Sequence, residues 1–259
     1  SNTADFALAG RSLPLAMVIT ATFATWFGSE TILGMPARFI SEGFAGIIEE
    51  PFGSGMALVL VGIFFARKLY NMDLLTIGDF YRKRYGHKVE LACSMFIIIS
   101  YLGWVGAQVA ALGLVMNMVT EGYISVTMGM CIGTFVVLLY TVYGGMWSVA
   151  VTDFFQMIII IAGLVLIAFF AGDMAGGFTK VVEFADSRNL FYMWPSDKSA
   201  AGWLFWISSA MTMMIGSIPQ QDVFQRVMSA KNANTAVAGP ILGGTFYICF
   251  AFVPMFIVC

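Results

Sequence analysis

The sequence predicts an all-α membrane protein, and three observations lead to that fold class. Of the 259 residues, 59% are hydrophobic and only 11% are charged, and the mean hydropathy is +0.86. A soluble domain is roughly 45–50% apolar and about 25% charged. Long windows without any charge, such as 91–120 and 122–152, follow one another along the chain. Since about 20 apolar residues cross a bilayer as a helix, we predict several membrane spans.

The charge-free windows divide the chain into about seven predicted transmembrane helices. Each window either reaches the length of a span or can be extended to it. The predicted ranges are 13–38, 44–69, 88–119, 124–143, 150–172, 202–224 and 235–259. These runs are apolar on all sides, whereas the strands of a membrane barrel would alternate lipid-facing and polar positions over about 10 residues. Helices are therefore favoured.

The balance of charges limits the partners of this protein. With 13 basic and 15 acidic residues the net charge is −2, so the chain has no basic field for nucleic acid. We expect contact with membrane lipid and none with nucleic acid. No motif pairs a nucleophile with a base, so an enzyme is not expected.

Lysine and arginine in the short loops predict the orientation. Many of these residues lie in two loops, 67–88 and 226–231. Under the positive-inside rule both loops are cytoplasmic, which puts the long polar segment 173–201 outside. The predicted localisation is a multi-pass plasma membrane protein, which in a bacterium means the inner membrane.

Several acidic residues fall within or beside the predicted spans, where an ionisable group is costly and so suggests a function. They are Glu30, Glu49, Glu50, Asp153 and Asp222. Glu30 lies among Gly28, Gly34 and Pro36, which make a poor continuous helix. A helix broken near the membrane midplane is how many secondary transporters expose carbonyl groups to an ion. A kink satisfied by neighbouring helices is the structural alternative.

The other acids have structural alternatives as well. Glu49 and Glu50 diverge by about 100° on a helix, so one is expected to point inward and the other toward the outer interface. Asp153 at the start of its predicted span would be favoured there by the helix dipole. Asp222 follows Pro219, where the predicted sixth span is either interrupted or simply ends.

Four segments, in order along the chain, resemble the sodium:solute symporter family. The most specific is YTVYGGMWSVAVTDFFQ at Tyr140–Gln156, with its Gly-Gly pair and its Thr-Asp-x-x-Gln ending. The others are AGRSLP at 9–14, TIGDFYRKRYG at 76–86 and QQDVFQRVMSAKNA at 220–233. Within the family, ATWFG and the spacing to Trp104 are similar to the choline-type carriers.

The resemblance implies an inverted-repeat fold of two five-helix units, of which this chain is a truncated part. We expect one transmembrane transporter module over 1–259. Residues 13–172 would form the first repeat, 173–201 an external loop and 202–259 the start of the second repeat. Further helices would follow position 259.

The resemblance also implies a coupling Na⁺ and no organic cofactor. The carbonyl groups of Ala24 and Phe27 would hold the ion, since a hard cation prefers oxygen ligands, and Asp153 matches a position linked to coupling and gating. A small organic solute would lie against Trp26, Ser29, Glu30, Thr31, Glu50, Gly53, Trp104, Gln220 and Gln221. Choline-type carriers have tryptophan where this chain has Gln220, so choline-like molecules, amino acids and other small solutes all stay open.

Two functions are expected on these grounds. The first is Na⁺-coupled symport of a small solute by alternating access. The second is a transporter-like sensory membrane domain of a signalling protein such as a histidine kinase, which sequence beyond residue 259 would distinguish.

Overall fold

The computed structural model describes residues 3–259, and its regular structure over that range is helical. The α-helices are α1 (Thr3–Leu8), α2 (Leu15–Trp26), α3 (Met35–Glu42), α4 (Ser54–Leu60), α5 (Ala66–Asn71), α6 (Ile77–Tyr85), α7 (His87–Val119), α8 (Val126–Met174), α9 (Phe178–Ser187), α10 (Ala200–Gly216), α11 (Gln221–Ser229), α12 (Ala233–Phe250) and α13 (Phe252–Val258). Short 3-10 or π-helical segments join some of them: η1 (Ala9–Arg11), η2 (Glu30–Gly34), η3 (Gly43–Ile47), η4 (Ile48–Gly53) and η5 (Val61–Phe65). The predicted all-helical class is confirmed.

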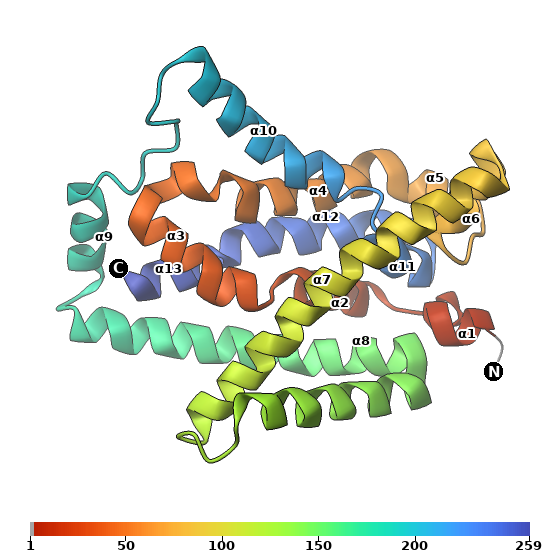
Figure 1. Cartoon of the computed structure of the whole chain (residues 1–259), viewed down its shortest axis with the longest axis horizontal. Coiled ribbons are helices and arrows are strands. Elements are labelled where there is room, and N and C mark those ends of the chain that lie inside the picture. Colours follow the sequence, from red (N-terminus) through yellow and green to blue (C-terminus); the bar gives the residue numbers. More distant parts are fainter. Residues whose placement is uncertain (1–2) are drawn as a thin grey trace.

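The helices gather the two basic loops at one end of the molecule. In Figure 1, α5, α6 and α11 lie together at the right, whereas α9 and the C-terminal residue lie at the left. The segment 173–201 lies at the end of the molecule opposite to the basic loops. Its polar sequence forms α9 and a following turn rather than a loop alone.

The α8 helix consists of two rods that run in opposite directions (Figure 1). The reversal occurs at Gly145, whose φ of 54° and ψ of −146° are not helical. Glycine adopts this conformation without the strain that a side chain would add. The predicted helices 124–143 and 150–172 correspond to the two rods, but the loop expected between them shrinks to a single turn.

The first predicted span is interrupted close to the expected place. The α2 helix ends at Trp26, Phe27 is not helical (φ −83°, ψ 69°), and a π-helical turn starts at Glu30. The helix then continues to Glu42, beyond the predicted end at 38, because the chain turns only at Gly43 with its φ of +67°.

Within residues 3–259, four helical runs are long and apolar enough to cross a membrane, or five if α10 and α11 are taken as one span bent by 42°. The four runs are Glu30–Asn71, α7, α8 and Ala233–Val258. Seven were predicted. The number is smaller because the first run contains the turn at Gly43, α8 contains the reversal at Gly145, and the break at Phe27 leaves α2 with only 12 residues.

The α12 helix forms the centre of the molecule, packed between α2 on one side and α4 with η5 on the other. Its contact with α4 is very close: a Cβ atom on Gly244 would lie 2.7 Å from the Gly55 carbonyl oxygen. Small residues of this kind let helix backbones approach in membranes, where packing rather than hydrophobicity drives helix association. The α12 helix therefore holds both α2, which ends at the first break, and α4, which follows Glu49 and Glu50.

Candidate functional site

The break between α2 and η2 releases a backbone carbonyl from the helical ladder. In a continuous α-helix the Gly28 N–H would bond to the Ala24 carbonyl, but here it donates to the Trp26 carbonyl at 3.0 Å. The non-helical Phe27 lies between them, with its side chain only 2% exposed. A released carbonyl oxygen such as that of Ala24 is the kind of ligand that Na⁺ accepts, so the break is compatible with the ion expected at Ala24 and Phe27.

Glu50 is held at this break by two hydroxyl groups. Thr31 Oγ1 donates to Glu50 Oε1 at 2.6 Å, and Tyr247 Oη donates to the same oxygen at 2.5 Å. Both hydroxyl-bearing residues are fully buried, and their oxygens are 3.0 Å apart. Hydrogen bonds to a carboxylate are stronger than neutral ones, and they offset part of the cost of burying its charge. The acid thereby joins η2, η4 and α12.

Tyr247 was not among the residues predicted for the site. A single tyrosine in the apolar run GTFYICF gives no pattern that distinguishes it from packing. Its function as a hydrogen-bond donor becomes visible only because the fold brings α12 against Glu50.

The two adjacent acids diverge as predicted. Glu49 Oε2 lies 3.8 Å from Arg38 Nη1 and faces outward, away from the Glu50 hydroxyl contacts. It lines a cavity of about 660 Å³ at the end that holds α9, together with Glu42, Arg188, Asp197 and Trp206. Hydrogen bonds from the Ser199 hydroxyl and N–H lower the pKa of the Asp197 carboxyl, which favours its ionised form.

One face of α7 is bonded to both interrupted helices. Ser29 Oγ, next to the first break, donates to Gln108 Oε1 at 3.0 Å. Seven residues earlier on α7, Tyr101 Oη donates to Asp222 Oδ1 at 2.5 Å, just after the break between α10 and α11. Residues i, i+3 and i+7 share a helix face, so Trp104 lies between these two bonds, 44% exposed and edge-on to the Tyr101 ring at 6.1 Å.

Some of the predicted solute contacts are not brought together. Gln221 Oε1 accepts from the Ile77 N–H at 2.9 Å, so this side chain turns toward the basic loop. Gly53 packs against α10, where a Cβ atom would lie 3.0 Å from the Ala210 carbonyl oxygen. Glu30 is exposed.

The remaining predicted contacts lie near the breaks. Trp26 is half-buried and packs against the core, at the end of α2. Gln220 directly precedes the first residue of α11. Thr31 is the one predicted contact that bonds directly to Glu50.

Asp153 lies well inside the second rod of α8, because that rod starts immediately after Gly145. The alternative that it caps the first turn of a helix is therefore wrong. Its Oδ2 atom is buried and has no hydrogen-bond partner within the described chain, and the same holds for Nε of Arg226. The two residues form no ion pair with each other. A buried carboxylate oxygen without a partner is costly and is available to a cation.

An all-helical apolar chain with two interrupted helices that meet on α7, and with buried acids beside them, has the features that are typical of multi-pass membrane transport proteins. More particularly, the chain is a member of the sodium:solute symporter family, whose model matches residues 6–259. This confirms the resemblance that the four sequence segments indicated.

Curated relatives are transporters and not enzymes. "High affinity choline transporter 1" of Homo sapiens is 27% identical over 88% of this chain and 39% of its own length. The "High-affinity choline transporter 1" of Caenorhabditis elegans is 28% identical over 98% of this chain and 43% of its own. The "Sodium/glucose cotransporter" of Vibrio parahaemolyticus is 25% identical over 92% and 46%. The chain thus spans about two fifths of the length of these relatives.

Proposed function

We propose that this chain is part of a Na⁺-coupled symporter that carries a small organic solute by alternating access. The observation that carries this proposal is the attachment of two helix breaks to one face of α7, through Ser29–Gln108 and Asp222–Tyr101. Broken helices near the midplane are where secondary transporters bind ion and solute. The family and the names of its relatives support sodium as the coupling ion.

The ion would be held by the carbonyl oxygens of Ala24 and Phe27. The unpartnered Asp153 oxygen would then attract the cation as it leaves that position, with Arg226 as its competitor when the ion is absent. Solute transport is coupled to Na⁺ if the break between α2 and η2 can close around the solute only while the bound ion neutralises the carbonyl dipoles.

The solute would lie between the breaks, against Trp26, Trp104 and the Glu50 carboxylate. Two aromatic faces and one carboxylate favour an organic cation or a zwitterion with an amine, through cation–π attraction and charge pairing. Choline transporters among the relatives support the first of these, and Gln220, where choline-type carriers have tryptophan, leaves the second open. No organic cofactor is involved in this scheme.

The proposed topology has seven spans, from the first repeat (13–172) to the start of the second (202–259). Gly43 and Gly145 then mark the returns between spans that follow one another directly. The loops 67–88 and 226–231 face the cytoplasm in this topology, because they hold the basic residues.

Uptake by the full-length protein in sealed vesicles tests the proposal. Labelled choline and labelled amino acids are offered with an inward gradient of Na⁺ or of K⁺. We expect Na⁺-dependent uptake and its loss in Asp153→Ala, while the matched acid-to-amide change Glu121→Gln, at an exposed residue of the 120–123 loop, leaves it unchanged. Uptake that is equal with K⁺ would overturn the proposal. Solute binding without any uptake would favour the sensory alternative instead.

A further inference from the structure

The end of the molecule that holds α5 and α6 carries positive charge in a dense cluster. Residues 67–88 contain six of the 13 lysine and arginine residues of the chain. All six are exposed: Arg67, Lys68, Arg82, Lys83, Arg84 and Lys88. Such a concentration of basic residues follows the positive-inside rule, and its effect on binding depends on whether acidic residues of the protein neutralise these charges.

The acidic residues of this region are already engaged. Asp73 Oδ1 pairs with Arg11 at 2.7 Å. Asp79 Oδ2 accepts from the Thr76 N–H at 2.8 Å in the capping box of α6. Glu90 Oε2 lies 2.8 Å from His87 and 3.8 Å from Arg82.

Five basic side chains therefore have no carboxylate within 4.0 Å in the part of the chain that the structure describes. These are Arg67, Lys68, Lys83, Arg84 and Lys88, which we call the basic rim. Arg67 bonds only to the neutral Asn234 amide oxygen at 2.8 Å, and Lys83 only to the Met72 carbonyl at 3.2 Å. The other three side chains make no hydrogen bond or ion pair with residues 3–259.

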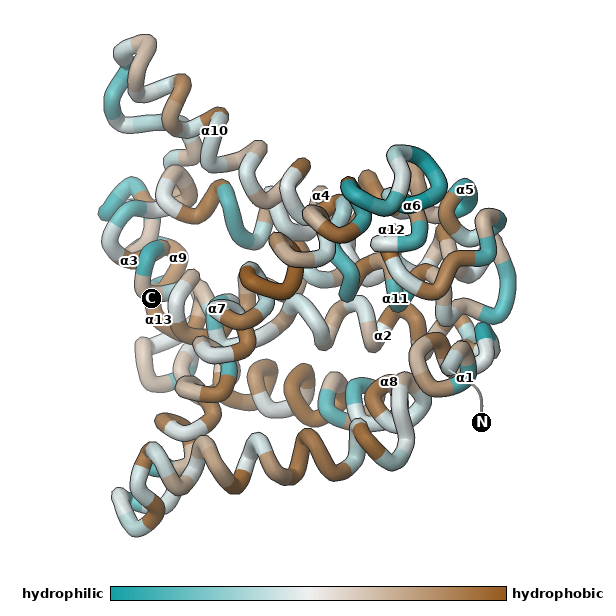
Figure 2. The backbone as a smooth tube through the Cα atoms, turned by 45° about the vertical axis from the view of Figure 1, so that its right-hand side comes forward, coloured by the Kyte–Doolittle hydropathy of each residue, from teal (hydrophilic) through white to brown (hydrophobic). Residues whose placement is uncertain are grey.

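The basic rim stands where exposed apolar surface begins. Phe64 is 58% exposed just before Arg67, and Phe96 is 74% exposed two turns after Lys88. Between them Tyr85 is 61% exposed and stacks on Tyr81. Figure 2 shows hydrophilic segments around α5 and α6 next to hydrophobic ones. Tyrosine at such a boundary is typical of the membrane–water interface, so its presence favours a rim at the depth of lipid headgroups.

We propose that the basic rim binds the headgroups of anionic lipids. Unneutralised cations beside exposed apolar surface attract an anionic membrane surface. The opposite end does not repeat this arrangement, since its basic residues are outnumbered by acids: Arg38, Lys180, Arg188 and Lys198 against Glu42, Glu49, Asp173, Glu183, Asp186 and Asp197. The proposal requires only that the chain crosses a membrane and is independent of what it transports.

Native mass spectrometry of the full-length protein in detergent tests this inference, with phosphatidylglycerol and phosphatidylcholine as probes. We expect phosphatidylglycerol to bind more tightly. The double variant Arg84→Gln/Lys88→Gln should lose about fivefold in affinity for each cation removed, while Arg84→Lys/Lys88→Arg keeps the wild-type affinity. The matched control Lys180→Gln/Lys198→Gln removes two charges from the opposite end and should change nothing.

Equal affinity of the wild type for the two lipids would overturn the proposal. So would an equal loss in the control variant, because the effect would then follow net charge rather than the basic rim. Circular dichroism and the melting temperature of each variant identify a loss of folding. If the double glutamine variant fails to fold, Arg84→Lys/Lys88→Arg tests the proposal instead. Loss of its preference for phosphatidylglycerol contradicts the proposal, and retention supports it.

Discussion

Tyr101 and Asp222 are joined by two hydrogen bonds of opposite direction. The Tyr101 hydroxyl donates to the Asp222 carboxylate at 2.5 Å and accepts from the Asp222 N–H at 3.0 Å. The pair fixes α7 to the first turn of α11, where the helix dipole also favours a carboxylate. A motion that separates α11 from α7 must break both bonds together.

Replacing Tyr101 with phenylalanine should loosen this junction. Both hydrogen bonds are lost, and a half-buried carboxylate is left with one partner fewer, so we expect a loss of about 1–2 kcal/mol in stability. Thermal unfolding of the purified protein measures the change. Tyr123→Phe is the control, because Tyr123 is 92% exposed and its hydroxyl makes no hydrogen bond within residues 3–259. A melting temperature for Tyr101→Phe equal to that of the control would contradict the prediction.

The two hydroxyl donors on Glu50 should act as a unit. Thr31→Val and Tyr247→Phe each remove one donor from the same carboxylate oxygen. After one is lost the carboxylate moves or protonates, so the second loss should cost less than the first, and the effects in the double variant should be non-additive by about 0.5–3 kcal/mol. Uptake rates of the two single variants and the double variant, measured in vesicles, give the coupling.

Tyr143→Phe is the control for this comparison of single and double variants, since Tyr143 is 85% exposed on α8. Combined with Thr31→Val it should give additive effects. Strict additivity in the Thr31 and Tyr247 pair as well would show that the two hydroxyls do not act through Glu50.

The break in the first span could be predicted from sequence, whereas the residues that surround it could not. Gly28, Gly34 and Pro36 mark a weak helix whatever its neighbours, so local composition was sufficient. Tyr247 and Gln108 are single polar residues in apolar runs, and each finds its partner across a distance in sequence, 197 residues for Tyr247 and Glu50.

The structural context of Asp153 was missed for a different reason. The sequence shows its Thr-Asp-x-x-Gln motif, but the reversal at Gly145 depends on φ and ψ angles that the apolar sequence around it does not reveal. The second rod therefore starts earlier than predicted, and an acid expected in the first turn lies deeper. When spans are predicted from the gaps between charges, the start of a helix is misplaced wherever the turn before it contains no charged residue.

The close contact between α4 and α12 predicts opposite effects for two glycine substitutions. In Gly244→Ala the new Cβ atom would lie 2.7 Å from a backbone oxygen of Gly55, which cannot move aside as a side chain could. Overpacking of this kind costs about 1–3 kcal/mol. Gly163→Ala on α8 meets nothing within 4 Å and should stabilise by about 0.5–1 kcal/mol, because glycine is unfavourable inside a helix. Melting temperatures that shift in the same direction would contradict this account.

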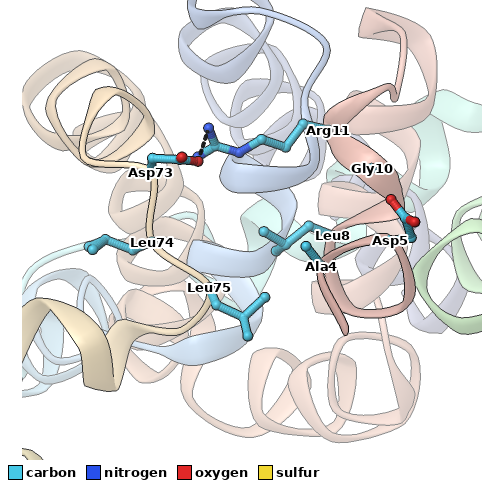
Figure 3. A pocket seen from close by; sticks show the side chains of 8 residues that line it. All are labelled: Ala4, Asp5, Leu8, Gly10, Arg11, Asp73, Leu74 and Leu75. Atoms are coloured by element: carbon cyan, nitrogen blue, oxygen red, sulfur yellow. Dashed lines mark ion pairs between the residues drawn. The ribbon is translucent and has the colours of Figure 1, made fainter. Parts of the chain in front are cut away.

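At the salt bridge between Arg11 and Asp73, replacing the arginine should lower the stability of the protein far more than replacing the aspartate. It lies beside a cavity of about 310 Å³ (Figure 3), with N···O at 2.7 Å, and the Asp73 side chain is 83% exposed whereas that of Arg11 is 24% exposed. Exposed ion pairs contribute only about 0–1 kcal/mol. Arg11 also donates to the Tyr70 carbonyl at 3.1 Å and lies over the Tyr70 ring at 4.7 Å.

Asp73→Asn should therefore lower the stability by less than about 1 kcal/mol. Arg11→Gln should cost about 1–3 kcal/mol, because it leaves the partly buried Tyr70 carbonyl and the Tyr70 ring without their partner. Unfolding of both variants at low and high salt measures the difference, and only the small contribution of the ion pair should vanish with salt. The control Asp186→Asn removes an exposed acid of α9 that makes no ion pair within residues 3–259. Equal losses in the Asp73 and Arg11 variants would mean that the ion pair alone holds this end of the molecule together.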